Sequence, residues 1–405
     1  MAHTQPLRVA LINFHFAQNY GAVLQALALQ DRLRDIGCEV AIIDYRPRGH
    51  WQQYARIPNP LLSAWWKMRG AVAVGDGYVP ATRQAARRAV RALSSWRNAR
   101  ARGARLQSFE EFMKGSFSLT RRYNSLRQLR ASPPVADIYV TGSDQVWNPG
   151  NTGGLDPAYY LAFGGDTIVR AGYAVSPCRL DVRRHHSRLA RFAGAFDHLS
   201  LRESALVSDL SAVMRVKIDV VPDPVLLSTP AQLERYAAPI QRRSNPYILL
   251  YAVKAGPTYA TLVRLIEQLR ASTGAEVVDI SLDESDWPFE VTRPENLTPG
   301  SFISYIRDAQ YVASNSFHAT AFSLLFGRDF TVVTEPGTSD RITELLEFAG
   351  LSGRIASPES ADMLTAPIDY STVSPRLAEL RTIGEGFLTD VVEDGRRRHS
   401  SAAPV

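Results

Sequence analysis

A polar turn followed by a histidine is the part of the sequence best suited to acid–base chemistry. A strand is predicted over 311–313, a polar triplet follows it, and a helix then runs to Gly327. His318 falls in the first turn of this helix, where N–H groups can hold an anion and an imidazole can transfer a proton to it. The alternative is that Asn315 or Ser316 only caps the helix and that His318 packs under the sheet edge.

A second polar turn follows a predicted strand in the first half of the chain. The strand covers 137–141 and runs into the segment Gly142-Ser-Asp-Gln-Val-Trp-Asn-Pro149. Asp144 and Gln145 would then lie at the carboxyl edge of a sheet, where parallel sheets bind their ligands. Trp147 could stack on a sugar ring or fill the core.

The opening of the chain is predicted to be a βαβ unit. Strands are expected over 8–13 and 39–44, with a helix over 22–36 between them. Asn19 and Gly21 lie at the start of that helix, where the backbone could approach a ligand. No GxGxxG pattern occurs there, so dinucleotide binding is poorly supported. The alternative for both residues is a turn and a cap without a ligand.

The alternation of strands and helices restarts after a segment rich in Pro, Gln and Arg at 227–245. This predicts an α/β fold of two Rossmann-like domains that face a cleft, as in the two-domain (GT-B) glycosyltransferases. The predicted domains are 1–228 and 229–393. A basic helical insertion is expected at 46–107 in the first domain, and a flexible tail at 394–405.

The composition is typical of a soluble globular protein. The chain has 405 residues, 45% of them hydrophobic and 21% charged, which suggests two domains. No apolar run approaches the roughly 18 residues of a membrane helix, and we expect no signal peptide. Cys38 and Cys178 have no metal-like spacing, so no metal site is expected. We therefore expect a cytoplasmic protein.

The charge is concentrated in the insertion. No acid lies between Asp76 and Glu110, whereas eight arginines do, and the net charge of the whole chain is +6. Apolar residues recur there at helical spacing: Ala86, Val90, Leu93 and Trp96. Such a helix could lie on an anionic membrane or hold an anionic acceptor, or it could be a solvated helix packed on the first domain. Nucleic acid is not expected as a partner, because no recognised binding module accompanies the charge.

Taken together, these segments resemble the polysaccharide pyruvyl transferase family. They match it in the right order over most of the chain, apart from the insertion and the tail. The matching segments are Asn19-Tyr-Gly-Ala-Val-Leu-Gln-Ala-Leu27, Gly142-Ser-Asp-Gln-Val-Trp-Asn148, Arg170-Ala-Gly-Tyr-Ala-Val-Ser176, Leu201-Arg-Glu203, Asp223-Pro-Val-Leu-Leu227, Ser316-Phe-His318 with Phe322-Ser-Leu-Leu325, and Arg341-Ile342.

The resemblance implies transfer of a pyruvyl group from phosphoenolpyruvate, as donor substrate without a cofactor, to two hydroxyls of one sugar as a cyclic ketal. The implied acceptors are cell-surface polysaccharides or their lipid-linked precursors, which would bring the protein to the inner face of the membrane. The family commonly has an arginine two residues before the histidine, where this chain has Ser316. Arg202 and Arg341 are the candidates to replace it. His318 would act as the acid and Asp144 as the base.

Two other classes of function stay open. A nucleotide-sugar glycosyltransferase would share the two-domain architecture, but phosphoenolpyruvate would not stabilise it. A non-catalytic saccharide-binding protein would keep Trp147 and the basic segment functional while tolerating His318→Ala.

Overall fold

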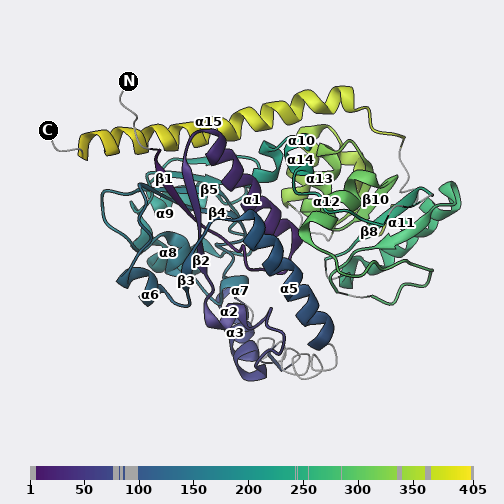
Figure 1. Ribbon diagram of the computed structural model, residues 1–405, viewed down its shortest axis with the longest axis horizontal. Coiled ribbons are helices and arrows are strands. Elements are labelled where there is room, and N and C mark those ends of the chain that lie inside the picture. Colours follow the sequence, from purple (N-terminus) through teal and green to yellow (C-terminus); the bar gives the residue numbers. More distant parts are fainter. Residues whose placement is uncertain are drawn as a thin grey trace. The chain divides into compact units, whose positions relative to one another are not determined.

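The chain forms two compact units (Figure 1). The computed structural model describes residues 6–75, 82, 85–86, 99–241, 243, 245–253, 255–283, 285–334, 340–360 and 366–402. The first unit takes its residues from 1–18, 22–227 and 382–405, and the second from 19–21 and 228–381. The chain thus passes into the second unit at Ser228, one residue before the predicted boundary, and returns to the first at Thr382.

The first unit contains a seven-stranded sheet in the order β3-β2-β1-β4-β5-β6-β7. Each neighbouring pair of these strands is parallel. The order reverses between β1 and β4, which is where a doubly wound sheet opens a crevice beyond its carboxyl ends. The strands are β1 (Arg8–Ile12), β2 (Glu39–Tyr45), β3 (Leu119–Tyr123), β4 (Ile138–Asp144), β5 (Val169–Val175), β6 (His198–Leu201) and β7 (Ile218–Val220).

Helices connect these strands, and the predicted βαβ opening is present. The helix predicted over 22–36 spans Tyr20–Asp35. The insertion contributes three helices among its described residues, but most of its arginine-rich part, including 87–98, lies outside them. The helices are α1 (Tyr20–Asp35), α2 (Arg48–Trp51), α3 (Pro60–Ala73), α5 (Ala99–Ser116), α6 (Leu126–Ala131), α7 (Pro149–Thr152), α8 (Val182–Leu189) and α9 (Val207–Met214).

The second unit contains a five-stranded sheet in the order β12-β11-β10-β8-β9, again with parallel neighbours. Its order reverses between β8 and β10, which places a second switch point there. The strands are β8 (Tyr247–Tyr251), β9 (Glu276–Asp279), β10 (Tyr311–Ser314), β11 (Asp329–Val333) and β12 (Ile355–Ala356). The helices are α10 (Pro230–Glu234), α11 (Tyr259–Thr273), α12 (Pro299–Asp308), α13 (Phe317–Leu325) and α14 (Asp340–Ala349). Two doubly wound parallel sheets confirm the predicted pair of Rossmann-like units.

The prediction of a flexible tail at 394–405 is wrong for 394–402, because α15 (Tyr370–Ala402) continues as a helix to Ala402, and 403–405 lie outside the described residues. Its part from Thr382 onward belongs to the first unit, where Leu388 and Val391 are fully buried. The segment from Asp394 consists largely of small and polar residues in the sequence, but one of the small residues, Gly395, allows close packing. A Cβ on Gly395 would lie 2.6 Å from Cδ1 of Ile138.

Candidate functional site

The turn between β10 and α13 lies at the switch point of the second sheet. The hydroxyl of Ser314 donates to the carbonyl of Tyr251 over 2.5 Å, and the N–H of Ser316 donates to Ser314 Oγ over 3.0 Å. Asn315 links the turn to the loop after β8: its Oδ1 accepts from the N–H of Val253 over 2.7 Å, and its Nδ2 donates to the carbonyl of Val253 over 3.2 Å. The neutral groups of the turn thus hold β8 and β10 together at this edge.

Ser316 is the N-cap of α13. Its hydroxyl accepts from the N–H of Ala319 over 3.4 Å, and its carbonyl accepts from the hydroxyl of Thr320 over 3.0 Å. The capping role that the sequence allowed for Ser316 is therefore present, and Asn315 links two loops. Contacts of either residue with a ligand stay predictions.

His318 lies in the first turn of α13 and is 8% exposed. Its ring meets the ring of Phe317 edge to face, with 5.4 Å between their centroids. Residues 19–21 group with this unit, and a Cβ built on Gly21 would lie 2.1 Å from Nδ1 of His318. Glycine at position 21 therefore leaves room for the imidazole of His318. This explains why a residue without a side chain stands here, which the sequence alone did not show. Asn19, in the same segment, is half-buried.

Arg341 brings a cation close to this turn. Its guanidinium carbon lies 5.8 Å from the ring centroid of Phe317, the first residue of α13. Arg341 stands in the first turn of α14, directly after a segment outside the described residues. Of the two arginines that the sequence suggested for anion binding, Arg341 is the one in the same unit as His318.

Asp144 ends β4 at the switch point of the first sheet. Its carbonyl accepts from the N–H of Ser176 over 3.0 Å, and its carboxylate accepts from Nη2 of Arg202 over 3.4 Å. The Asp144 side chain is 17% exposed, whereas that of Arg202 is 2% exposed. The carboxylate of Asp144 can therefore contact solvent, while the guanidinium group of Arg202 binds it from the buried side.

The guanidinium group of Arg202 forms ion pairs with carboxylates of its own unit. Its Nη1 donates to Oδ2 of Asp223 over 2.6 Å, and its Nε lies 3.8 Å from Oε2 of Glu203. Burial opposes the charge of the guanidinium, but these carboxylates and that of Asp144 outweigh it and raise the pKa of Arg202. The position of Arg202 therefore suits orientation of Asp144 better than capture of a ligand anion.

Gln145 and Trp147 have internal partners. Oε1 of Gln145 accepts from Nδ2 of Asn148 over 2.7 Å. Trp147 is 1% exposed and stacks on Tyr160 with 4.5 Å between ring centroids. Its indole N–H donates to the carbonyl of Tyr159 over 2.9 Å. An indole in this position has no face open to a sugar, so the structure corrects the substrate-binding prediction for Trp147 to a role in the core.

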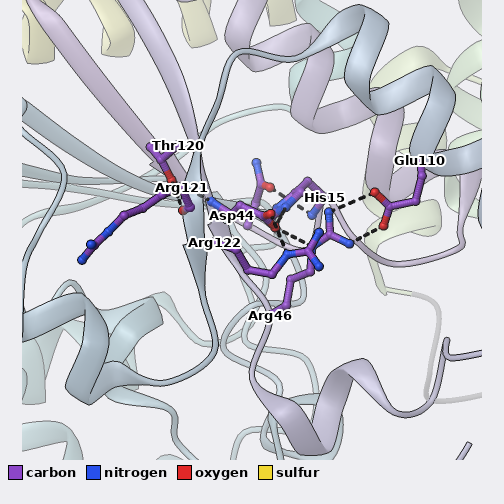
Figure 2. Close-up of polar contacts among 8 residues, drawn as sticks. His15, Asp44, Arg46, Glu110, Thr120, Arg121 and Arg122 are labelled. Carbon is purple, nitrogen blue, oxygen red and sulfur yellow. Dashed lines mark hydrogen bonds and ion pairs between the residues drawn. The ribbon is translucent and has the colours of Figure 1, made fainter.

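Sequence reasoning missed a group of paired charges, built around the buried His15, Asp44 and Arg46, at the carboxyl ends of β1, β2 and β3 (Figure 2). Nε2 of His15 lies 3.1 Å from Oδ1 of Asp44, and Nε of Arg122 donates to Oδ2 of Asp44 over 3.0 Å. Arg46 pairs with both Asp44 and Glu110. Two guanidinium groups thus face two carboxylates. The only signal in the sequence is that polar residues lie at or just after the ends of the two strands predicted over 8–13 and 39–44.

The titration of this buried group follows from its pairing. Burial raises the pKa of the Asp44 carboxyl, but His15 and Arg46 outweigh this effect and keep it well below its usual range. Burial lowers the pKa of His15 despite Asp44 beside it, so the imidazole is neutral at neutral pH. The acid at the end of the second strand binds the ribose in dinucleotide-binding folds, whereas here Asp44 is occupied by protein partners. This agrees with the missing GxGxxG pattern.

Within the described ranges, no group of three or more His, Cys, Asp or Glu side chains could hold a metal ion. Among the same residues, no helix is both long and apolar enough to cross a bilayer.

Comparisons with known proteins give one family and distant structural likenesses. The family model described as polysaccharide pyruvyl transferase matches residues 19–335. No curated protein matches the sequence. The glycosyltransferase SnogD from Streptomyces nogalater is 13% identical over 96% of this chain and 100% of its own, with a TM-score of 0.45. The UDP-GlcNAc 2-epimerase from Methanocaldococcus jannaschii is 11% identical over 96% and 99%, with a TM-score of 0.44. At these identities and scores, no residue role carries over from either structure.

Proposed function

Because the chain belongs to the polysaccharide pyruvyl transferase family, we propose that it moves the pyruvyl group of phosphoenolpyruvate onto a sugar as a cyclic ketal. The proposed acceptor is a cell-surface polysaccharide or its lipid-linked precursor. The observation that carries the proposal is the neutral turn at the second switch point, which has His318 in the first turn of α13 and Arg341 beside Phe317.

The donor fits the chemistry of this turn. Phosphoenolpyruvate carries a carboxylate and a phosphate, and both are anions that helix N-termini and guanidinium groups bind well. The second unit supplies the start of α13 and the cation of Arg341. We assign to Arg341 the role of the arginine that the family commonly has at the position of Ser316, and to Arg202 the holding of Asp144.

The proposed reaction starts with a proton from His318. Protonation of the methylene carbon of phosphoenolpyruvate makes the neighbouring carbon cation-like, and a first sugar hydroxyl adds to it while Asp144 takes the hydroxyl proton. The bond to phosphate then breaks, and inorganic phosphate leaves with the electron pair. A second hydroxyl of the same sugar adds to the same carbon, and its proton restores His318, while the proton held by Asp144 passes to the departing phosphate. The products are the ketal and phosphate, so atoms and charge balance without a further cofactor.

The setting of the reaction follows from the acceptor. A lipid-linked saccharide is held at a membrane, so we also propose peripheral contact with the inner, cytoplasmic face of that membrane. This contact would need a surface with affinity for lipid headgroups.

Ligand-induced stabilisation tests the donor assignment. Phosphoenolpyruvate at a hundred times its dissociation constant should add about 2.7 kcal/mol to the unfolding free energy. Phosphate release should then depend on both phosphoenolpyruvate and a saccharide. The matched control is a nucleotide sugar at the same concentration, which should do neither. Stabilisation by the nucleotide sugar alone would instead identify a glycosyltransferase, and binding of a saccharide without phosphate release would identify a binding protein.

A further inference from the structure

The helix α3 is apolar on both of its faces. Its inner face carries Trp66 and Gly70: the indole N–H of Trp66 donates to the carbonyl of Asn151 over 3.0 Å, and a Cβ on Gly70 would lie 2.5 Å from the carbonyl oxygen of Gly150. These contacts hold α3 against α7 and fix which side of the helix faces outward.

The outward side carries a stripe of large apolar residues. Leu61 is 78% exposed, Trp65 46% and Val72 39%, and Met68 is half-buried between the last two. The stripe repeats at intervals of four, three and four residues, which is one side of an α-helix. Five of the nine most exposed large apolar side chains among the described residues lie between positions 57 and 72. An outward face of this composition is typical of an interaction surface.

The sequence that contains the stripe has no acidic residue. None occurs from Arg46 to Gly75. The guanidinium carbon of Arg69 lies 4.8 Å from the ring centroid of Trp65. Basic residues with tryptophan and leucine on a helix surface are typical of helices that lie in the headgroup region of anionic bilayers.

The first half of α5 carries basic residues that contact the segment leading into α3. Nη2 of Arg102 donates to the carbonyls of Gln53 and Ala55, both over 3.0 Å, just ahead of α3. The side chain of Arg56 lies against Gly103, since a Cβ there would be 3.2 Å from Cδ of Arg56. The apolar stripe and its basic surroundings therefore belong to one part of the first unit.

We infer that the outer face of α3, defined by Leu61, Trp65, Met68 and Val72, binds the surface of an anionic lipid bilayer. The apolar side chains enter the headgroup region while Lys67 and Arg69 contact phosphates. The inference names the surface for the membrane contact of the proposed function and rests on that function only for its biological setting.

Co-sedimentation of the full chain with vesicles tests the inference. Vesicles of three parts phosphatidylcholine to one part phosphatidylglycerol should bind the protein at low salt. Binding should fall at least about tenfold in phosphatidylcholine alone or at about 0.5 M salt. The double variant Leu61→Ser, Trp65→Ser should weaken binding at least about tenfold, and Lys67→Gln, Arg69→Gln about 30-fold. The matched control is Val135→Ser, which removes a side chain that is 76% exposed elsewhere in the first unit and should change nothing.

Absent binding at low salt, or equal binding by the α3 variants and the control, would overturn the inference. A self-association that the Leu61→Ser, Trp65→Ser variant abolishes would show that a second copy covers this face, and that too would overturn it. Stabilisation by phosphoenolpyruvate, measured on the same samples, separates the two proposals. Vesicle binding without stabilisation by phosphoenolpyruvate would count against pyruvyl transfer alone. Stabilisation by phosphoenolpyruvate without vesicle binding would count against the α3 surface alone.

Discussion

Both sheets end in polar residues at their carboxyl edges, but the turn after β10 differs in charge from the edge of the first sheet. At the first edge, Asp44 is paired with Arg46 and Arg122, and Asp144 accepts from Arg202, so each of these charges already has a protein partner. At the second edge, the turn at 314–316 is neutral and is held by its own hydrogen bonds. Paired charges orient one another and offer little to a new anion. A neutral turn at a helix start contains no charge that is already paired within the protein, so a bound anion can take that place. We therefore place the donor in the second unit.

The sharpest test of the first edge is Asp44→Ala. It leaves two arginines facing one remaining carboxylate, and breaking a buried ion network typically costs about 3–5 kcal/mol of unfolding free energy. Chemical denaturation measures this loss. Asp219→Ala, which breaks an ion pair whose lysine side chain is 85% exposed, should reduce the unfolding free energy far less. Equal losses in the two variants would mean that the Asp44 network stabilises no more than a surface pair.

At the second edge, His318→Gln should lower turnover at least about 10²-fold, because glutamine cannot deliver a proton to the enol carbon. The measurement is saccharide-dependent phosphate release, with a melting curve to show that the variant is folded. His186→Gln, at an exposed position, is the control and should turn over normally. Near-normal turnover of a folded His318→Gln protein would remove His318 from the chemistry.

Arg341→Ala should weaken phosphoenolpyruvate binding about 10- to 100-fold in calorimetry, the usual loss for a charge-assisted contact. Arg270→Ala is a matched control, because Arg270 lies over Phe289 at the same 5.8 Å but far along α11 from the turn. Arg202→Ala should reduce stability and leave donor affinity unchanged. A folded Arg202→Ala protein that has lost donor binding would reverse the roles that we assign to the two arginines.

The last test concerns a pH dependence in the first unit. His50 stacks on Trp66 with 5.8 Å between ring centroids, and burial lowers its pKa to about 3. The ordinary pKa of histidine is about 6.5. Between that pH and about pH 3, only the unfolded chain holds the proton, so the unfolding free energy decreases as the pH is lowered, by up to about 1.4 kcal/mol per pH unit. Above that window His50 contributes no slope.

His50→Phe should therefore flatten the pH profile of unfolding free energy below about pH 6.5 while keeping the stack on Trp66. Denaturation of both proteins at several pH values measures the difference. Parallel profiles would show that His50 takes up its proton in the folded state.

Sequence reasoning worked where the cause of a structure is local. The strand at Arg8–Ile12 reads as a nearly continuous apolar run because it is buried on both faces of a parallel sheet. The end of α13 was predicted from Gly327, whose φ of 63° suits glycine. Partners distant in sequence were missed, since Glu110 meets Arg46 across 64 positions. Trp147 was misjudged for the same reason: its covering ring, Tyr160, lies beyond the turn.

The last helix has a consequence for the order in which the protein is made. Leu388 and Val391 complete the core of the first unit, and Phe387 meets Tyr173 with 5.9 Å between ring centroids. The whole second unit, 228–381, is synthesised before these residues. On the ribosome, the second unit can finish folding while the first unit still exposes the apolar surface that α15 later covers. Chaperones that bind exposed apolar surface would therefore act on the first unit, although it is synthesised earlier.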